Sequence, residues 1–316
     1  DRAEYAASTT AALGAPLAIP WTSIAAGINA AAYTTDWPVN FAALSQGPTV
    51  YVSARAFDVA GNSTTLADAF FVLKDTTAPV ITDLQAGVTT WQTAPGAVYD
   101  VDFRDEGGSG LGALTYTAWT STGRLGTEII PWTSIASLPF GTTEYLTNWP
   151  VDFSALPQGV TAYISVRATD TAGSVSSLDD VFFVKKDTIP PAVTDNQAGD
   201  NPWRTGPGTL YNVDFQDTES RLDRSDYTVR TATGMGGAEL IPWTTIFASA
   251  DLASFTTDWS VNFSSLQSGT NYVSARVFDL AGQTTTAADL FFVKKDTSSP
   301  GISNNQAGDV VWRNAA

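Results

Sequence analysis

The chain has 316 residues, 43% of them hydrophobic, and a net charge of −16 from 16 basic and 32 acidic residues. It contains no Cys and no His, which excludes thiol chemistry, disulfides and imidazole catalysis, and its negative charge would repel a polyanion such as nucleic acid. No apolar run approaches the roughly 18 residues of a membrane-spanning helix, so we expect no membrane span in this segment.

Four sequence landmarks recur along the chain about once every 110 residues. The first, IPWTSI or IPWTTI, places Trp21, Trp132 and Trp243 at equal spacing. The second is TDWPVNF with its variants, the third is a hairpin of the type ARAFDVAGN, and the fourth is a closing segment of the type FFVKKDT. The second landmark contains Trp37, Trp149 and Trp259, and the third contains Asp58, Asp170 and Asp279. Because the tryptophans recur with the repeat, we interpret them as core anchors.

The repeat predicts four segments. Residues 1–79 form a module that lacks its first strands, because DRAEY at the start of the chain aligns with DRSDY at residues 223–227. Residues 80–190 and 191–300 form two complete modules, and residues 301–316 form the first strand region of a further one. Each joint contains proline, which restricts the backbone. We therefore expect short, semi-rigid linkers and modules arranged as a rod.

Apolar residues within a module alternate with a period of two. In NYVSARVFD, at residues 271–279, Val273, Ala275 and Val277 share one face and the residues between them share the other. Several such runs are bounded by Gly, Asp, Asn or Ser, and no segment has the pattern of an amphipathic helix. The predicted fold is all-β: tandem immunoglobulin-like Greek-key sandwiches of about 110 residues, each with seven or eight short strands.

Acidic residues in the second and third modules suggest a Ca²⁺ site. The strands YDVDFRDE and YNVDFQDTE and the three closing segments place carboxylates close together in the sequence, and Ca²⁺ prefers six to eight oxygen ligands. The candidate ligands are Asp100, Asp102, Asp105, Asp214 and Asp217 of the strands, and Asp75, Asp187 and Asp296 of the linkers. The hairpin aspartates could approach the linker aspartates. The alternative is that the strand acids line a solvent face and the hairpin aspartates cap their own turns. No other cofactor is expected.

Residues 301–316 have two interpretations. They belong to a window on a far longer polypeptide, or they complete the first module of another copy by strand addition, with Ile302, Gln306 and Trp312 as the inter-subunit strand. In both cases the expected partners are adjacent modules or other copies of the chain.

The hairpin followed by a strand and a KDTxxP linker resembles the tandem bacterial immunoglobulin-like repeats, related to fibronectin type III domains, of very long surface proteins and adhesins. The resemblance covers the whole chain. It implies display outside the cell or at its surface and a mechanical or adhesive function.

The function that we expect is a structural filament, stalk or surface fibre, and the alternative is an adhesive module that recognises a glycan or a partner cell surface. Trp119 is the candidate exposed aromatic, because it has no counterpart in the third module, and Asn62 and Asn262 match the N-glycosylation pattern. We expect no enzyme activity, because every pair of carboxylates recurs with the repeat and no module has an insertion large enough to form a pocket.

Overall fold

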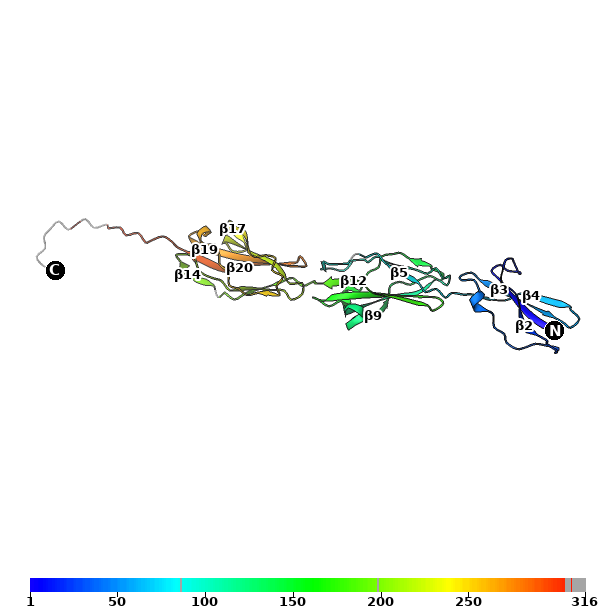
Figure 1. Ribbon diagram of the computed structural model, residues 1–316. Coiled ribbons are helices and arrows are strands. Elements are labelled where there is room, and N and C mark those ends of the chain that lie inside the picture. The colour runs from blue at the N-terminus through cyan, green and yellow to red at the C-terminus, as the bar shows by residue number, and fades with distance from the viewer. Residues whose placement is uncertain (86, 198, 305–307, 309–316) are drawn as a thin grey trace. The chain divides into compact units, whose positions relative to one another are not determined.

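The computed structural model describes residues 1–85, 87–197, 199–304 and 308, and almost all of its regular structure is β-strand (Figure 1). In the described residues, the helical elements are single turns of 3-10 helix, and no helix is long and apolar enough to cross a membrane. The chain separates into two compact units, Asp1–Lys186 and Asp187–Ala316.

The first unit begins with a four-stranded antiparallel sheet in the order β2-β1-β3-β4. Its core contains Tyr5, Ile19, Val50 and Val52, and Trp37 packs against this core while remaining partly exposed. The strands are β1 (Arg2–Ser8), β2 (Leu17–Ala26), β3 (Val50–Phe57) and β4 (Ser63–Val72).

The first unit continues with a sandwich of two sheets, which we call the second sandwich. A three-stranded sheet in the order β10-β7-β5 faces a five-stranded sheet in the order β6-β12-β11-β8-β9, and all pairs are antiparallel except β6 with β12. This arrangement is the immunoglobulin-like sandwich that the sequence predicts. The strands are β5 (Val80–Asp83), β6 (Trp91–Gln92), β7 (Val101–Arg104), β8 (Leu111–Ser121), β9 (Leu125–Ser134), β10 (Glu144–Tyr145), β11 (Thr161–Asp170) and β12 (Val175–Lys186).

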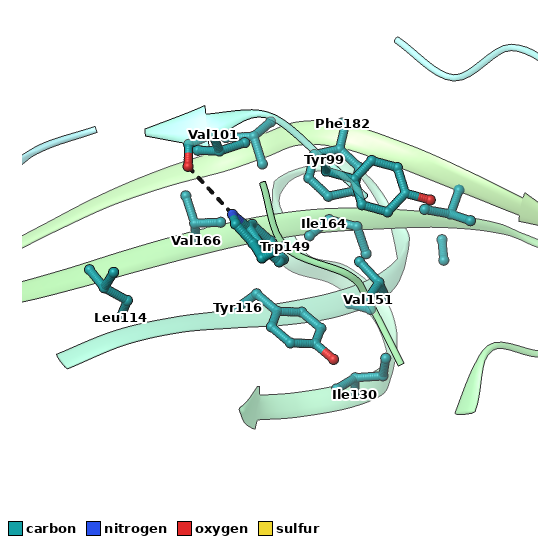
Figure 2. Packing of buried hydrophobic residues seen from close by; sticks show 14 of the residues in the cluster. Tyr99, Val101, Leu114, Tyr116, Ile130, Trp149, Val151, Ile164, Val166 and Phe182 are labelled. Atoms are coloured by element: carbon teal, nitrogen blue, oxygen red, sulfur yellow. Dashed lines mark hydrogen bonds between the residues drawn. The ribbon is translucent and has the colours of Figure 1, made fainter. Parts of the chain in front are cut away.

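The core of the second sandwich is built around Trp149 (Figure 2). Its side chain is 1% exposed, and its indole Nε1 donates a hydrogen bond of 3.4 Å to the carbonyl oxygen of Val101. The ring also packs against Tyr116 and Phe182, whose centroids lie 5.3 Å and 5.8 Å away. A buried indole is favourable here because its one polar atom has a partner while the rest of the ring fills apolar space.

The second unit forms the third sandwich, with sheets in the orders β13-β15-β18 and β14-β20-β19-β16-β17. Val273, Ala275 and Val277 are fully buried on one face of β19, which confirms the period of two. Trp259 occupies the position of Trp149, with its indole nitrogen bonded to Val213 O at 3.4 Å. The strands are β13 (Ala192–Asp195), β14 (Asp200–Arg204), β15 (Val213–Gln216), β16 (Leu222–Ala232), β17 (Gly236–Phe247), β18 (Ser254–Phe255), β19 (Gly269–Asp279) and β20 (Thr284–Lys295).

The interpretation of all recurrent tryptophans as core anchors is only partly correct. Trp149 and Trp259 are buried, but Trp132 and Trp243 lie partly exposed on the edge strands β9 and β17. An arginine two strands away in the same sheet, Arg167 or Arg276, covers each of these two rings with its guanidinium group. Such an arginine shields an indole that the core does not bury.

Candidate metal centres

Two clusters of three aspartates lie at one end of the second and third sandwiches. In each cluster, one carboxylate oxygen from every member lies within 4.8 Å of the others. One aspartate precedes the sandwich in the chain, one follows the middle strand of the three-stranded sheet, and one is at the hairpin after β11 or β19. Cluster 1 is Asp75, Asp105 and Asp170, and cluster 2 is Asp187, Asp217 and Asp279.

In cluster 1, backbone amides hold the carboxylates in place. The Asp105 oxygens accept hydrogen bonds from Gly107 N at 2.9 Å and Gly110 N at 2.7 Å. Asp75 Oδ2 accepts one from Ser109 N at 2.9 Å, which ties the segment between β4 and β5 to the loop after β7. These bonds fix the positions of the acidic groups before any ligand arrives.

The same loop fits closely around Asp75. A Cβ atom at Gly107 would overlap the Asp75 carboxylate, so any side chain at position 107 would displace that group. The absence of a side chain at this position therefore permits the close approach of the carboxylates.

Cluster 2 repeats this geometry at lower exposure. Asp187 is fully buried, and Asp217 and Asp279 are 3% and 2% exposed. Asp187 Oδ2 accepts a hydrogen bond from Ser220 N at 3.1 Å, and Asp217 Oδ1 accepts one from Glu219 N at 2.8 Å. The loop after β15 thus orients two carboxylates as the loop after β7 does in cluster 1.

One oxygen in each cluster has no hydrogen-bond partner. Asp170 Oδ1 bonds to Ser174 N and Asp279 Oδ1 bonds to Gln283 N, both at 2.7 Å. The other oxygen of each carboxylate, Oδ2, is buried and unbonded among the described residues. A buried carboxylate oxygen without a donor is costly, and a cation between the three carboxylates would remove that cost.

Burial is the largest influence on the pKa shifts in the clusters, and hydrogen bonds and neighbouring charges modify it. Burial, together with the charges of Asp187 and Asp217, raises the pKa of Asp279 to about 6. Burial and the charge of Asp187 also raise the pKa of Asp217. At Asp75, burial acts to raise the pKa, but hydrogen bonds from Ser109 and Thr77 outweigh it and lower the pKa. Two carboxylates of cluster 2, Asp217 and Asp279, are therefore harder to ionise than an exposed aspartate, whereas Asp75 of cluster 1 is easier to ionise.

The corresponding hairpin of the first sheet has a different geometry. Asp58 is exposed, and both of its oxygens are bonded to Asn62, one to the backbone amide and one to the side-chain amide, at 2.8 Å each. These bonds lower its pKa. Asp58 therefore caps its own turn, which is the alternative that the sequence left open for all three hairpins.

The structure groups some of the predicted ligands and leaves others apart. Asp75 and Asp105 meet in cluster 1, and Asp187 and Asp217 meet in cluster 2; each pair is joined by its hairpin aspartate. The remaining four predicted ligands do not join either cluster. Asp100 and Asp102 lie beside the outward face of β7, Asp214 accepts a hydrogen bond from Asn196 Nδ2 at 2.9 Å, and Asp296 accepts one from Ser298 N at 2.9 Å.

Other predicted sites have these surroundings. The side chain of Asn62 donates a hydrogen bond to Asp58. Asn262 is exposed, and its side chain accepts a hydrogen bond from Ser264 Oγ at 2.7 Å. Trp119 is partly exposed, and its indole nitrogen donates to Thr117 Oγ1 at 3.0 Å. Ile302 is 97% exposed, and the other two residues of the predicted inter-subunit strand, Gln306 and Trp312, lie outside the described residues.

The strand order and the clusters define an all-β array of immunoglobulin-like sandwiches with grouped carboxylates. No family model and no curated protein matches the sequence. Solved structures similar to this chain include a tetra-tandem repeat in the extending region of a large adhesion protein, fibronectin(III)-like modules of Clostridium thermocellum CbhA, and cadherin domains 1–5 of protocadherin gamma B2.

The identities to these three structures are 19%, 13% and 14%, and the TM-scores are 0.35, 0.28 and 0.31. The alignments cover 94%, 72% and 81% of this chain, and 67%, 100% and 47% of the three structures. Because all the TM-scores are below 0.5, the fold assignment depends on the strand order and pairing of this chain.

Proposed function

We propose that the chain is part of an extracellular structural array in which divalent cations, with Ca²⁺ as the favoured ion, tie each linker to the sandwich that follows it. The observation that carries this proposal is the unbonded, buried Oδ2 of Asp170 and of Asp279, each in a residue that is grouped with two further carboxylates. Three carboxylates offer up to six oxygens, the kind and number of ligand that Ca²⁺ accepts.

A bound cation would fix the linker at a defined point. Asp75 follows β4 by three residues and Asp187 follows β12 directly, yet both bond to a loop of the next sandwich. Holding the first residue of each linker against that loop leaves fewer freely rotating residues between modules. A stalk or surface fibre needs this restriction, because flexible linkers would let the array collapse.

An extracellular location agrees with the acidic, Cys-free composition, which keeps a long array soluble and independent of redox conditions. Calcium is also abundant outside cells, where modules with weak sites are occupied.

Calorimetric titration with Ca²⁺ tests the proposal, and we expect two sites. Asp170→Asn should remove one site and Asp279→Asn the other. Asp296→Asn is the matched control, because Asp296 occupies the linker position of Asp187 but belongs to neither cluster. If the chain bound no Ca²⁺, or if the control removed a site as well, the proposal would be wrong.

A second proposal is a filament assembled by strand addition. Phe70 of β4 is 40% exposed, whereas Phe182 and Phe291, at the same place in the repeat, are 2% exposed. Next to the first sheet is an open cavity of about 880 Å³, lined by Trp37 and Leu66 among others. We propose that residues 301–316 of another copy cover this face.

Size-exclusion chromatography with light scattering tests the filament. The whole chain should form concentration-dependent oligomers, and a chain without residues 301–316 should remain monomeric with both Ca²⁺ sites intact. Oligomers of unchanged size after the deletion would disprove strand addition.

A further inference from the structure

The outer face of the five-stranded sheet in the second sandwich has a row of aromatic side chains. Phe183, Tyr163 and Trp119 lie directly opposite one another on β12, β11 and β8, and all three are partly exposed. The rings of Phe183 and Tyr163 have centroids 6.2 Å apart. Trp91 on β6 lies beyond the end of the row, opposite Lys185 of β12, whose Nζ is 5.7 Å from the centre of the Trp91 ring and 5.8 Å from that of the Phe183 ring. At about 4.8 Å per strand, the three aligned rings of the aromatic row span roughly 10 Å.

An arginine without an acidic partner lies on the same face. Arg167 is four residues from Tyr163 along β11, about 13 Å away, and its guanidinium carbon lies 4.5 Å from the centre of the Trp132 ring. Residue 115, opposite Arg167, is a threonine. Among the described residues, no carboxylate forms an ion pair with Arg167.

The first sheet and the five-stranded sheet of the third sandwich each have a carboxylate opposite the corresponding arginine. Arg55 is opposite Glu4 and pairs with it at 2.6 Å, and Arg276 is opposite Asp226 and pairs with it at 2.9 Å. The missing partner in the second sandwich leaves the guanidinium donors of Arg167 available. An unpaired, partly buried arginine is a ready partner for a ligand carboxylate.

The third sandwich differs at the aromatic row as well. Arg230 replaces Trp119 opposite Tyr272 and pairs with Glu239 at 2.6 Å. In the second sandwich the residue opposite Trp119 is Glu128, which is exposed and forms no ion pair among the described residues. The outer face of the second sandwich thus combines stacking surfaces with an arginine and a glutamate that form no ion pair among the described residues, and Glu128 accepts only a long hydrogen bond of 3.5 Å from Thr117 Oγ1.

We infer that this face binds a largely neutral glycan that carries isolated carboxylates. Apolar faces of sugar rings stack on the aromatic row, a carboxylate of the glycan pairs with Arg167, and hydroxyl groups donate to Glu128. The net charge of −16 would repel a dense polyanion, so local charge complementarity at Arg167 favours a ligand with few charges. This inference is independent of the two metal centres.

Glucuronoxylan is a suitable probe, because it has a neutral backbone with isolated glucuronic acid units. Affinity electrophoresis at 0.15 M salt should show binding of the chain to glucuronoxylan, and at least tenfold weaker binding to the same polymer after carboxyl reduction. Polygalacturonate, a dense polyanion, should bind more weakly than glucuronoxylan. Parallel runs in Ca²⁺ and in EDTA should agree, which separates this site from bridging through the metal centres.

Two variants copy residues that the third sandwich already contains. Thr115→Asp supplies the acid that pairs with Arg276 there, and it should reduce binding to glucuronoxylan tenfold while leaving binding to the carboxyl-reduced polymer unchanged. Trp119→Arg supplies the partner of Glu128 and should weaken binding to both polymers. Unchanged melting temperatures would show that both variants fold. Binding by Thr115→Asp equal to that of the unmodified chain, or no binding of the unmodified chain to glucuronoxylan, would overturn the inference.

Discussion

The effect of Asp279→Asn on stability should depend on whether cluster 2 holds Ca²⁺. The effect of removing Ca²⁺ from the unmodified chain sets the scale. For a ligand at 100 times its dissociation constant, binding stabilises a protein by about 2.7 kcal/mol. In a folded region of this size, about 1 kcal/mol shifts the melting temperature by roughly 4 °C, so EDTA should lower the melting temperature of the third sandwich by about 10 °C.

The Asp279→Asn variant should reverse its sign between these conditions. In EDTA, the ionised carboxylate is unfavourable, because its pKa is about 6 against an ordinary value of 3.8. That difference corresponds to roughly 3 kcal/mol at pH 7, an upper limit for the gain in the variant. In Ca²⁺, the variant loses a charged ligand and most of the metal-dependent stabilisation.

Differential scanning calorimetry at pH 7 measures both effects. One set of scans contains about 5 mM Ca²⁺, which is enough to fill a weak site, and the other contains about 5 mM EDTA. Asp170→Asn in cluster 1 supplies a second case, and Asp296→Asn is the neutral control. If Asp279→Asn destabilised the chain in EDTA as much as in Ca²⁺, the carboxylate would be acting through hydrogen bonds alone, and the reasoning about a metal centre would be refuted.

Three further predictions concern the pKa of Asp279, the close fit at Gly107 and the burial of Trp149. Because the folded state raises the pKa of Asp279 from 3.8 to about 6, the cation-free chain should lose stability as pH rises from about 4 to 6, which urea unfolding in EDTA would show. Gly107→Ala should weaken Ca²⁺ binding at cluster 1 at least tenfold in a calorimetric titration and leave cluster 2 unchanged. Trp149→Phe should cost about 2 kcal/mol in urea unfolding, against less than about 1 kcal/mol for the partly exposed Trp132→Phe.

The all-β fold could be predicted from the sequence because alternation and repetition are both local signals. The pattern at Val273, Ala275 and Val277 identifies a strand and its buried face without knowledge of its neighbours. The position of Trp132 could not be inferred in this way. It lies in a strand whose pairing with β8 has register shifts, and each shift changes which side chains face the core.

The membership of the metal centres was only partly predictable for a related reason. Asp102 is close in sequence to Asp105, but alternation along β7 places it on the outward face, and Asp100 precedes the strand, whereas Asp105 lies in the loop beyond it. Asp170 is distant in sequence and reaches the cluster only because β11 ends beside that loop, where Thr171 N bonds to Gly110 O at 2.8 Å. The recurrence of the hairpin and linker aspartates suggested that they could meet, but which strand acid joins them depends on tertiary packing, which spacing along one chain does not encode.

The outer faces of the second and third sandwiches differ by an exchange of paired residues. The third sandwich has Asp226 and Arg230 where the second has Thr115 and Trp119. The exchange removes one negative and one positive charge, so the net charge of the face is unchanged, but it leaves one unpaired charge of each sign. A purely structural face gains nothing from two unpaired charges beside an added indole. A face that stacks on sugar rings and bonds to their substituents uses all three groups, and for this reason the second sandwich is where binding should be sought first.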